Sequence, residues 1–281
     1  MIVLFFSNVD KFSKNVFTSI KDKLNSIEDS LTYSIYTYGD TYVVYLKDID
    51  LPLVDRETLE KIIQKIDTSR SLRIIFISRH EMKNPKPLLT VHTSGNWSKA
   101  EYGGYDYEIS ISNACLNSNI LRMLNKLAQE NSLLDKYSIS MEATHHGPSI
   151  DYESCFIEVG STIEEWSDIR CIKIFQYLIE DIVQNYEKYL KKVGKISISI
   201  GDLHYCTLTN HVLSGEYDIG HTIPKYIENI IEKNIVDSIL KTRPDVECVI
   251  IHWKSLKKDV REFVINIVKS RFPNIEIIKR K

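Results

Sequence analysis

Residues 137–149, with the sequence YSISMEATHHGPS, decide the fold of this chain. Residues 137–141 predict a β-strand, and the Gly-Pro pair at 147–148 predicts a turn soon after it. Glu142, His145 and His146 therefore stand where a strand ends, and a carboxylate with two imidazoles can form a metal site or an acid–base site there. Four more histidines also stand at or just past the end of an apolar run: His80, His92, His204 and His252.

Apolar runs of strand length alternate with segments of helical periodicity along the whole chain. Strands are predicted at 1–7, 31–38, 42–46, 72–77, 88–91, 137–141, 154–157, 196–200, 246–251 and 275–278. Helices are predicted at 10–24, 59–66, 116–127, 162–191, 230–240 and 260–269, the fourth beginning with a Thr162/Glu165 capping box. This alternation predicts an α/β fold whose sheet has helices on both faces.

No composition break, repeat or low-complexity linker divides the chain, so residues 1–281 are predicted to form a single domain. In open α/β sheets the ligand crevice lies outside the carboxyl ends of the strands. If most strands are parallel, we therefore expect the residues at their carboxyl ends to converge in one cleft: His80, His92, Glu142, His145, His146, Glu158, His204 and His252.

Composition limits the cellular setting and the partners. No apolar stretch approaches the ~20 residues that cross a bilayer. Five widely spaced cysteines without a CxxC pair favour a reducing compartment, so we expect a cytoplasmic protein. A net charge of −2 gives no general attraction to nucleic acid. The basic residues after 252, among them Lys257, Lys258 and Arg261, could hold a phosphate backbone, or could simply be the solvated face of a helix.

The adjacent histidines allow more than one interpretation. On an extended chain Glu142, Thr144 and His146 share one side while His145 points to the other. Such a pair suits two nearby metal ions, or one ligand and one supporting group. A histidine pair that caps a turn through hydrogen bonds is the structural alternative. No HExxH helix is present, which removes the commonest pattern of a single-zinc protease.

The stretch after the strand at 88–91 offers His92 as a ligand, the hydroxyls of Thr93 and Ser94, and a glycine that permits close backbone approach. Such a turn can bind an oxyanion, and an ordinary turn is the alternative. Asn96 closes the motif. The glycine- and aromatic-rich residues 97–107 predict a loop long enough to be functional.

The stretch after the strand at 196–200 has a similar character. Asp202 and His204 alternate onto one face if the chain is extended, which suits metal binding, and Tyr205 could donate to a developing oxyanion. A polar strand end is the alternative. Residues 220–226 predict a turn stiffened by proline, in which His221 and Lys225 could meet a phosphate or a carboxylate, or Lys225 could be a surface lysine.

Together these motifs resemble the D-aminoacyl-tRNA deacylase family of the archaeal and plant type. The resemblance rests on SRH (78–80), VHTSGN (91–96), EATHHGP (142–148), EVGS (158–161), the His204-Tyr205 turn and GHTIPKY (220–226), in the family's order and spacing. In one departure, residues 201–206, GDLHYC, stand where the family has a glycine-rich turn and a proline. The resemblance implies a three-layer α/β/α sandwich with a mixed, mostly parallel sheet, of phosphorylase/hydrolase-like type and related to peptidyl-tRNA hydrolases.

The resemblance also implies an activity. The expected enzyme is a zinc-dependent hydrolase of the ester between a D-amino acid and the terminal ribose of tRNA. We expect two zinc ions per chain, a monomer, and contact with the acceptor end of tRNA. The expected catalytic residues are Glu142, His146, Thr93, Ser94 and Tyr205. The expected metal ligands are His80, His92, His145, His146, His204 and Glu158. The expected substrate and tRNA contacts are Asn96, Lys225, His221, Lys257, Lys258 and Arg261.

Two other functions stay open at this stage. A zinc exopeptidase or amidohydrolase acting on small amides would need a pocket closed to a tRNA end and no basic track. A non-catalytic tRNA-binding module would have structural histidines and no zinc.

Overall fold

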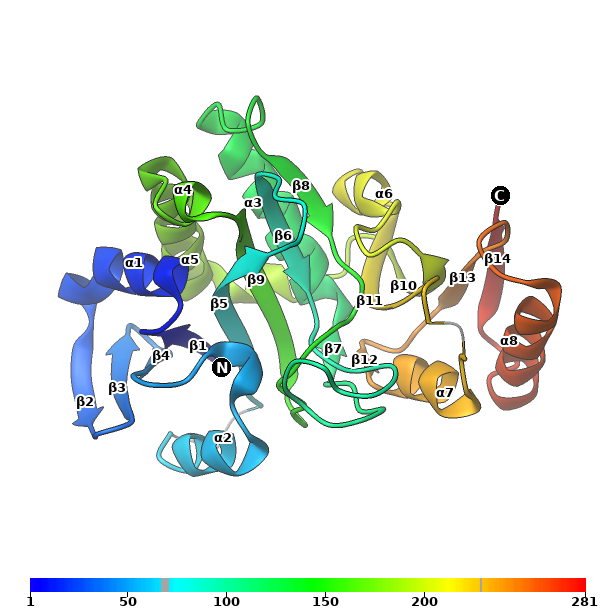
Figure 1. Ribbon diagram of the computed structural model, residues 1–281, viewed down its shortest axis with the longest axis horizontal. Helices are drawn as coiled ribbons and strands as arrows, with labels where there is room; N and C mark the ends of the chain where they lie inside the picture. Colours follow the sequence, from blue (N-terminus) through cyan, green and yellow to red (C-terminus); the bar gives the residue numbers. More distant parts are fainter. Residues whose placement is uncertain (67–70, 228) are drawn as a thin grey trace.

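The computed structural model describes residues 1–66, 71–227 and 229–281, which form two sheets side by side with helices on both faces (Figure 1). The strands of the larger sheet are β1 (Ile2–Ser7), β2 (Asn25–Asp29), β3 (Tyr33–Tyr38), β4 (Thr41–Leu46), β5 (Arg73–Glu81), β6 (Leu88–His92), β8 (Ser138–Met141) and β9 (Glu153–Ser161). Their order is β2-β3-β4-β1-β5-β9-β6-β8. The four central strands β4, β1, β5 and β9 are parallel, whereas β6 pairs antiparallel with β9.

The smaller sheet is entirely parallel. It contains β10 (Lys195–Asp202), β11 (Tyr217–Pro224), β13 (Cys248–His252) and β14 (Glu276–Arg280), in the order β11-β10-β13-β14. A third pair joins the two-residue strands β7 (Ser112–Asn113) and β12 (Thr242–Arg243).

Alternating apolar residues direct the helices to the two faces of the larger sheet. Leu4 and Phe6 of β1 enter one core, and Val3 and Phe5 enter the other. The first core is covered by α1 (Lys11–Ile20), α3 (Ala114–Glu130) and α5 (Ile169–Tyr189), and the second by α2 (Arg56–Ile63). The smaller sheet packs Ile198, Ile200 and Ile251 against α7 (Glu232–Leu240) and α8 (Lys258–Arg271).

Short elements complete the chain: α4 (Ile163–Trp166), α6 (Thr209–Leu213) and the 3-10 turns η1 (Lys21–Lys23) and η2 (Leu51–Leu53). Helix α3 contacts β6 and β8 of the larger sheet and β11 of the smaller one, so one core runs beneath both sheets. This continuity supports the single-domain prediction, which stays a prediction. Within the described ranges, no helix has both the length and the apolar character of a bilayer span.

The predicted α/β class and the mostly parallel sheet are confirmed, whereas two local predictions are wrong and one strand is not predicted. Residues 217–224 form the buried strand β11 rather than a turn, since Pro224 occupies only its last position. The exposed, polar β2 was missed because it lacks apolar alternation. The helix predicted at 162–191 is two helices, because Asp168 caps a new one by accepting from the Arg170 N–H; the Thr162/Glu165 capping box is confirmed.

Candidate active site

Three strands of the larger sheet bring one carboxylate and two histidines to the same face. Glu158 on β9 pairs with Ser78 of β5 on one side and with Thr90 of β6 on the other. Because side chains alternate along a strand, His80 and His92, each two residues farther along, point to the same face as Glu158. These residues therefore come together, whereas His252, which was also expected in the cleft, lies beside Asp202 instead. The reason for the convergence is not the expected one. β6 runs antiparallel to β9, so His92 approaches Glu158 from the opposite direction to His80.

Glu142 reaches this face directly after β8. Met141, the last residue of β8, pairs with Val91, and the Glu142 N–H donates to the Val91 carbonyl at 3.1 Å. Glu142 therefore lies beside His92, with its Oε2 at 3.8 Å from His92 Nε2. Its Oε1 lies 3.4 Å from His80 Nδ1. The register of three strand pairs thus assembles two buried carboxylates between two histidines.

Gly160 makes room for His80. The two residues are paired across β5 and β9. A Cβ at Gly160 would lie 2.8 Å from both the Cβ and the Cδ2 of His80, closer than real side chains come. A larger residue at position 160 would therefore push His80 out of the cluster, which explains the glycine in the EVGS motif.

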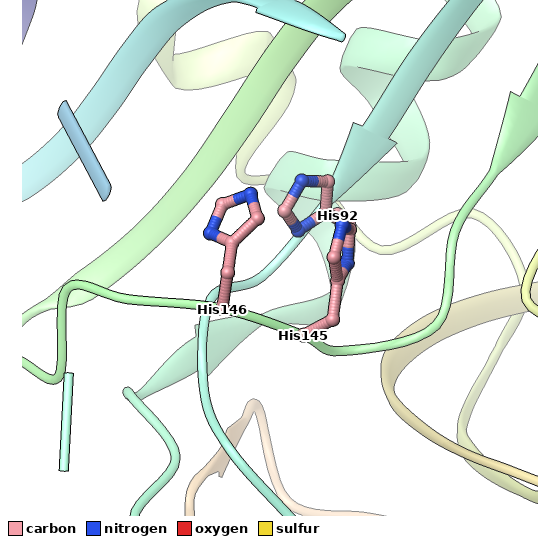
Figure 2. A group of neighbouring side chains, drawn as sticks. All are labelled: His92, His145 and His146. Carbon is pink, nitrogen blue, oxygen red and sulfur yellow. The ribbon is translucent and has the colours of Figure 1, made fainter. Parts of the chain in front are cut away.

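His145 and His146 point to the same side of the chain, and Figure 2 shows both rings beside His92. The ring of His92 is centred 4.2 Å from that of His145 and 4.9 Å from that of His146. The prediction that the two adjacent histidines face opposite sides is wrong, because His146 has a φ of 43° and the backbone is not extended there. The Gly95 N–H holds this turn by donating to the carbonyls of His145 (3.2 Å) and His146 (2.6 Å).

These three imidazoles all present the same nitrogen to the cluster. Each Nδ1 is hydrogen bonded to a backbone carbonyl: His92 to Thr93 (3.2 Å), His145 to Ala143 (2.9 Å) and His146 to Gly147 (2.6 Å). A carbonyl oxygen can only accept, so each Nδ1 carries the proton and each Nε2 keeps its lone pair. Metal-binding histidines are oriented in this way by a carbonyl or carboxylate behind the ring.

His204 and Tyr205 come from the loop after β10, in the smaller sheet. The Ala143 N–H donates to the His204 carbonyl at 2.8 Å, so this loop runs alongside the segment that follows β8. The His204 ring lies 4.6 Å from the His145 ring, and the Tyr205 hydroxyl lies 2.8 Å from His80 Nε2. Both sheets thus contribute to one site, with the smaller sheet supplying an imidazole and a phenol.

The donor atoms of the cluster fit a metal ion. Three groups have ligand atoms that all lie within 4.8 Å of one another: His92/His145/His146, Glu142/His145/His204 and His80/Glu142/Glu158. Among the described residues, His92 Nε2 and both Glu142 oxygens are buried without a hydrogen-bond partner. The imidazole nitrogens facing Glu142 are 3.4 to 4.0 Å away, too far for good hydrogen bonds. Buried unpartnered polar atoms are costly, and a cation among them removes that cost.

The electrostatics of the cluster distinguish its two carboxylates. Burial raises the pKa of Glu142 to about 8. Burial also acts to raise the pKa of Glu158, but the neighbouring imidazoles of His146, His80 and His92 outweigh it and hold that pKa well below the usual range. Burial lowers the pKa of His145 far below 6.5, helped by the neighbouring imidazoles. Burial lowers the pKa of His92 as well, whereas at His80 burial is outweighed by the carboxylates of Glu142 and Glu158, which raise the pKa to about 9. An ionised Glu158 beside the neutral imidazoles of His92 and His145 is a donor set that zinc takes in catalytic sites.

Two cavities, of about 470 and 440 Å³, meet at the cluster. They share a wall made by Tyr102, His145, His146 and His204. We call the cavity that also contains Asp50, Glu81 and Glu158 the acidic cavity. We call the one that also contains Trp97, Lys99 and Tyr226 the tyrosine cavity. Glu142 lines neither of them and lies beneath the histidines.

Thr93 and Ser94 do not face the site. The Thr93 hydroxyl donates to Ser112 Oγ at 2.8 Å, and the Ser94 hydroxyl donates to the Pro148 carbonyl at 2.8 Å. Both side chains are buried, and neither lines either cavity. The prediction that they stabilise an oxyanion is therefore wrong: their hydroxyls hold neighbouring segments together.

Asn96 lines the tyrosine cavity and also supports the loop at 97–107. Its Nδ2 donates to the Gly103 carbonyl at 2.9 Å and to the Tyr105 carbonyl at 3.3 Å. Its contact with substrate stays a prediction, but its position at the cavity is consistent with one.

His221 and Asp202 are not in the site. His221 is fully buried in β11, with its Nδ1 at 3.0 Å from Thr144 Oγ1, so the prediction that it contacts substrate or tRNA is wrong. Asp202 faces His252, with Oδ2 at 3.4 Å from Nε2, rather than joining His204. Lys225 is exposed just past β11 and lines neither cavity.

Lys257, Lys258 and Arg261 lie at the start of α8, at one end of the molecule (Figure 1). The lysines are exposed, whereas Arg261 donates to the Trp253 carbonyl and lies over its ring, 4.5 Å from the centroid. None of the three lines either cavity. Their role in tRNA binding stays a prediction.

Several residues of the cavities were not among the predicted site residues, among them Arg79, Tyr226, Tyr102 and Asp50. Arg79 and Tyr226 lie inside the SRH and GHTIPKY motifs, and Tyr102 lies in the aromatic loop, so a signal was present for each. Asp50 had no such signal. It is brought to the acidic cavity by an ion pair with Arg79, at 2.8 Å, and it accepts a hydrogen bond from the Tyr102 hydroxyl at 3.1 Å.

Comparison with known proteins agrees with these motifs. The D-aminoacyl-tRNA deacylase family model matches residues 67–277. A D-aminoacyl-tRNA deacylase of Caldivirga maquilingensis is 38% identical over 265 residues, covering 92% of this chain and 93% of the relative. One of Pyrococcus horikoshii is 30% identical over 286 residues, covering 99% and 100%. A crystal structure of a conserved protein of unknown function matches with a TM-score of 0.86 at 25% identity, covering 99% of this chain and 95% of that one. This chain belongs to the D-aminoacyl-tRNA deacylase family.

Proposed function

We propose that this chain hydrolyses the ester of D-aminoacyl-tRNA, releasing a free D-amino acid and tRNA, with zinc bound by the histidine–carboxylate cluster. The observation that carries the proposal is the convergence of imidazole Nε2 lone pairs and two buried carboxylates where two cavities meet. The names of the curated relatives supply the substrate class. The predicted cytoplasmic location and monomeric state are part of the same proposal.

We place one zinc at His92, His145 and His146 and a second at His80, Glu142 and Glu158. These two groups share no residue, which supports two ions rather than one. Zinc in such a site supplies Lewis-acid polarisation and lowers the pKa of a bound water. Because Glu142 is buried beneath the cavities, it serves better as a ligand than as a base that meets substrate.

The residues that face the cavities perform the remaining steps. Glu158 lines the acidic cavity, where its lowered pKa keeps it ionised although it also makes it a weak base. With zinc bound nearby to make the attacking water more acidic, Glu158 would orient that water and take up its proton. Burial raises the pKa of Tyr205 above its usual range, so its phenol stays protonated and can donate to the ester oxyanion. The leaving ribose oxygen takes up the proton. Selection of the D-configured carbon then rests on which side chains the cavity walls exclude.

Metal analysis of the purified protein combined with deacylation of D- and L-charged tRNA tests this proposal. The expected result is about two zinc ions per chain, release of D-amino acids, and loss of activity after chelation that added zinc restores. A chain that deacylates D-aminoacyl-tRNA at full rate without any metal would overturn the zinc assignment. Turnover of small amides but not of charged tRNA would favour the exopeptidase alternative, and tRNA binding without turnover would favour the binding module.

A further inference from the structure

The two cavities are neighbours that share the wall formed by Tyr102, His145, His146 and His204. An aminoacyl-tRNA end consists of a nucleoside and an aminoacyl group joined by the scissile ester. If the ester lies at the wall, one cavity holds the nucleoside and the other holds the aminoacyl group. Volumes of about 470 and 440 Å³ suit small ligands of this size. Resting on the proposed function, we infer that the tyrosine cavity binds the terminal adenosine, with its base stacked on Tyr226, and that the acidic cavity binds the aminoacyl group.

The aromatic residues of the tyrosine cavity suit it to a nucleoside base. Tyr226 is 52% exposed, so a face of its ring is open to a ligand. Its hydroxyl lies 3.1 Å from His204 Nδ1, which fixes the ring beside the cluster. Trp97, 3% exposed, forms the wall behind it. Stacking on an aromatic ring is how proteins hold unpaired bases, whatever their sequence.

The charged residues of the two cavities support the same assignment. Outside the proposed zinc site, the acidic cavity has two carboxylates, Asp50 and Glu81, against the guanidinium of Arg79. It repels the phosphate that precedes a terminal nucleoside and attracts the ammonium group of an amino acid. The tyrosine cavity has Lys99 beside Glu101. Lys225, exposed next to Tyr226, adds a second cation on this side.

Tyr102 is fixed between the two cavities and separates them. Its hydroxyl donates to Asp50 Oδ2 at 3.1 Å, and its carbonyl accepts from the Gly147 N–H at 2.9 Å. Gly103, with a φ of 70°, lies against Pro52 so closely that a Cβ would come within 1.8 Å of the Pro52 carbonyl oxygen. This packing holds the aromatic loop in one place and gives the wall a defined shape.

Binding of AMP tests the assignment independently of catalysis. Calorimetry on the zinc-loaded and the chelated protein measures the dissociation constant for Tyr226→Ala, Tyr226→Phe and Tyr177→Ala. We expect Tyr226→Ala to weaken AMP binding about tenfold or more, because one stacked base is lost. Tyr226→Phe keeps the ring and loses only the hydrogen bond with His204, so it binds AMP within about threefold of the parent. Tyr177, 39% exposed on α5, is the matched control and its replacement leaves binding unchanged.

A pair of substrates adds a second readout. The ratio of kcat/KM for a D-aminoacyl adenosine ester to that for the methyl ester of the same amino acid falls about tenfold in Tyr226→Ala and stays constant in Tyr177→Ala. Equal AMP affinity in the parent and in Tyr226→Ala, or no AMP binding at millimolar concentration, overturns the adenosine assignment. Either result leaves deacylation of whole tRNA intact, so it is distinguishable from failure of the proposed function.

Discussion

The histidines of the two sheets differ in what surrounds them, although they follow strands in a similar way along the sequence. At the larger sheet, His92, His145 and His146 direct Nε2 lone pairs at one another and at buried carboxylates. In the smaller sheet, His252 lies alone, with its Nε2 at 3.1 Å from Ser199 Oγ and 3.4 Å from Asp202 Oδ2. His221 is likewise buried among strands, away from both cavities.

The difference shows that a strand-end histidine becomes a ligand only where other donors converge on it. One oxygen of Asp202 is already occupied: its Oδ1 accepts from the N–H groups of Leu203 and Thr207 and from the Thr207 hydroxyl, whereas its Oδ2 has no hydrogen-bond partner within the described part of the chain. That pairing supports the loop that carries His204. Glu142, by contrast, has two oxygens without partners. Unsatisfied groups are available for a metal ion where several of them converge, as at Glu142. Asp202 Oδ2 and His221 Nε2 are also unpartnered, but they belong to none of the possible metal-binding groups among the described residues.

The largest expected effect comes from His146→Ala compared with His252→Ala. Removing a metal ligand takes ion and rate together, so His146→Ala loses zinc and more than about 100-fold in deacylation rate, beyond the loss from a supporting group. His252→Ala keeps its zinc and loses about 1–3 kcal/mol of stability, because the buried Ser199 hydroxyl loses its hydrogen-bond partner. Zinc per chain, deacylation rate and urea unfolding measure these outcomes. Equal zinc loss in both variants would contradict the assignment of His146 as a metal ligand and of His252 as a structural residue.

Glu142→Gln and Glu158→Gln separate the roles of the two buried carboxylates of the cluster. Glu142 lies beneath the cavities and Glu158 lines one of them. We expect Glu142→Gln to lose zinc and rate in parallel, about 100-fold in each, since a ligand charge is removed. Glu158→Gln loses more in rate than in zinc affinity, because a proton acceptor is removed as well. Zinc titration and single-turnover deacylation separate the two effects. If Glu142→Gln is inactive but keeps all of its zinc, Glu142 acts as the general base and not as a ligand.

His221→Gln tests whether buried His221, in the smaller sheet, makes the stability of the protein depend on pH. Burial lowers the pKa of His221 from 6.5 to about 3. The unfolded chain binds this proton below pH 6.5 and the folded chain does not until about pH 3, so the stabilisation is complete above pH 6.5 and is lost as the pH falls toward 3. At about 1.4 kcal/mol per pH unit, the parent loses on the order of 2 kcal/mol from this group between pH 6.5 and 4.5.

The variant lacks this loss, so its stability falls less steeply with acidification over the same range. Urea unfolding of parent and variant, both after chelation to exclude the metal ligands, gives the difference. Parallel stability–pH curves for the two proteins would contradict the buried, neutral state of His221.

The smallest effect is expected from neutral replacement of Lys257, Lys258 and Arg261 together. If α8 holds the acceptor stem, tRNA binding weakens and its salt slope falls by up to about 3, roughly 1 for each phosphate that is no longer neutralised. Replacement of the exposed Lys11 and Lys14 on α1, at the other end of the molecule in Figure 1, is the control. Filter binding at several salt concentrations measures the slope. An unchanged slope would show that these residues are only the solvated face of a helix.

The sequence by itself determined the α/β class, the positions of most strands and helices, and the family motifs. Apolar periodicity is local, so β5, β6, β8 and β9 could be predicted from neighbouring residues alone. The histidines at or just past the ends of those strands were visible for the same reason. Motif order and spacing then identified the family and most of the cluster.

Which of those residues come into contact depends on the tertiary structure. Strand direction and register join residues far apart in sequence, so the antiparallel approach of His92 to Glu158 has no local signal. A single residue with positive φ, His146, reversed the expected separation of the paired histidines. Burial of His221 and the inward hydroxyls of Thr93 and Ser94 likewise depend on the elements that pack around them. Periodicity shows which way a side chain points along its own element, but only packing shows what it faces.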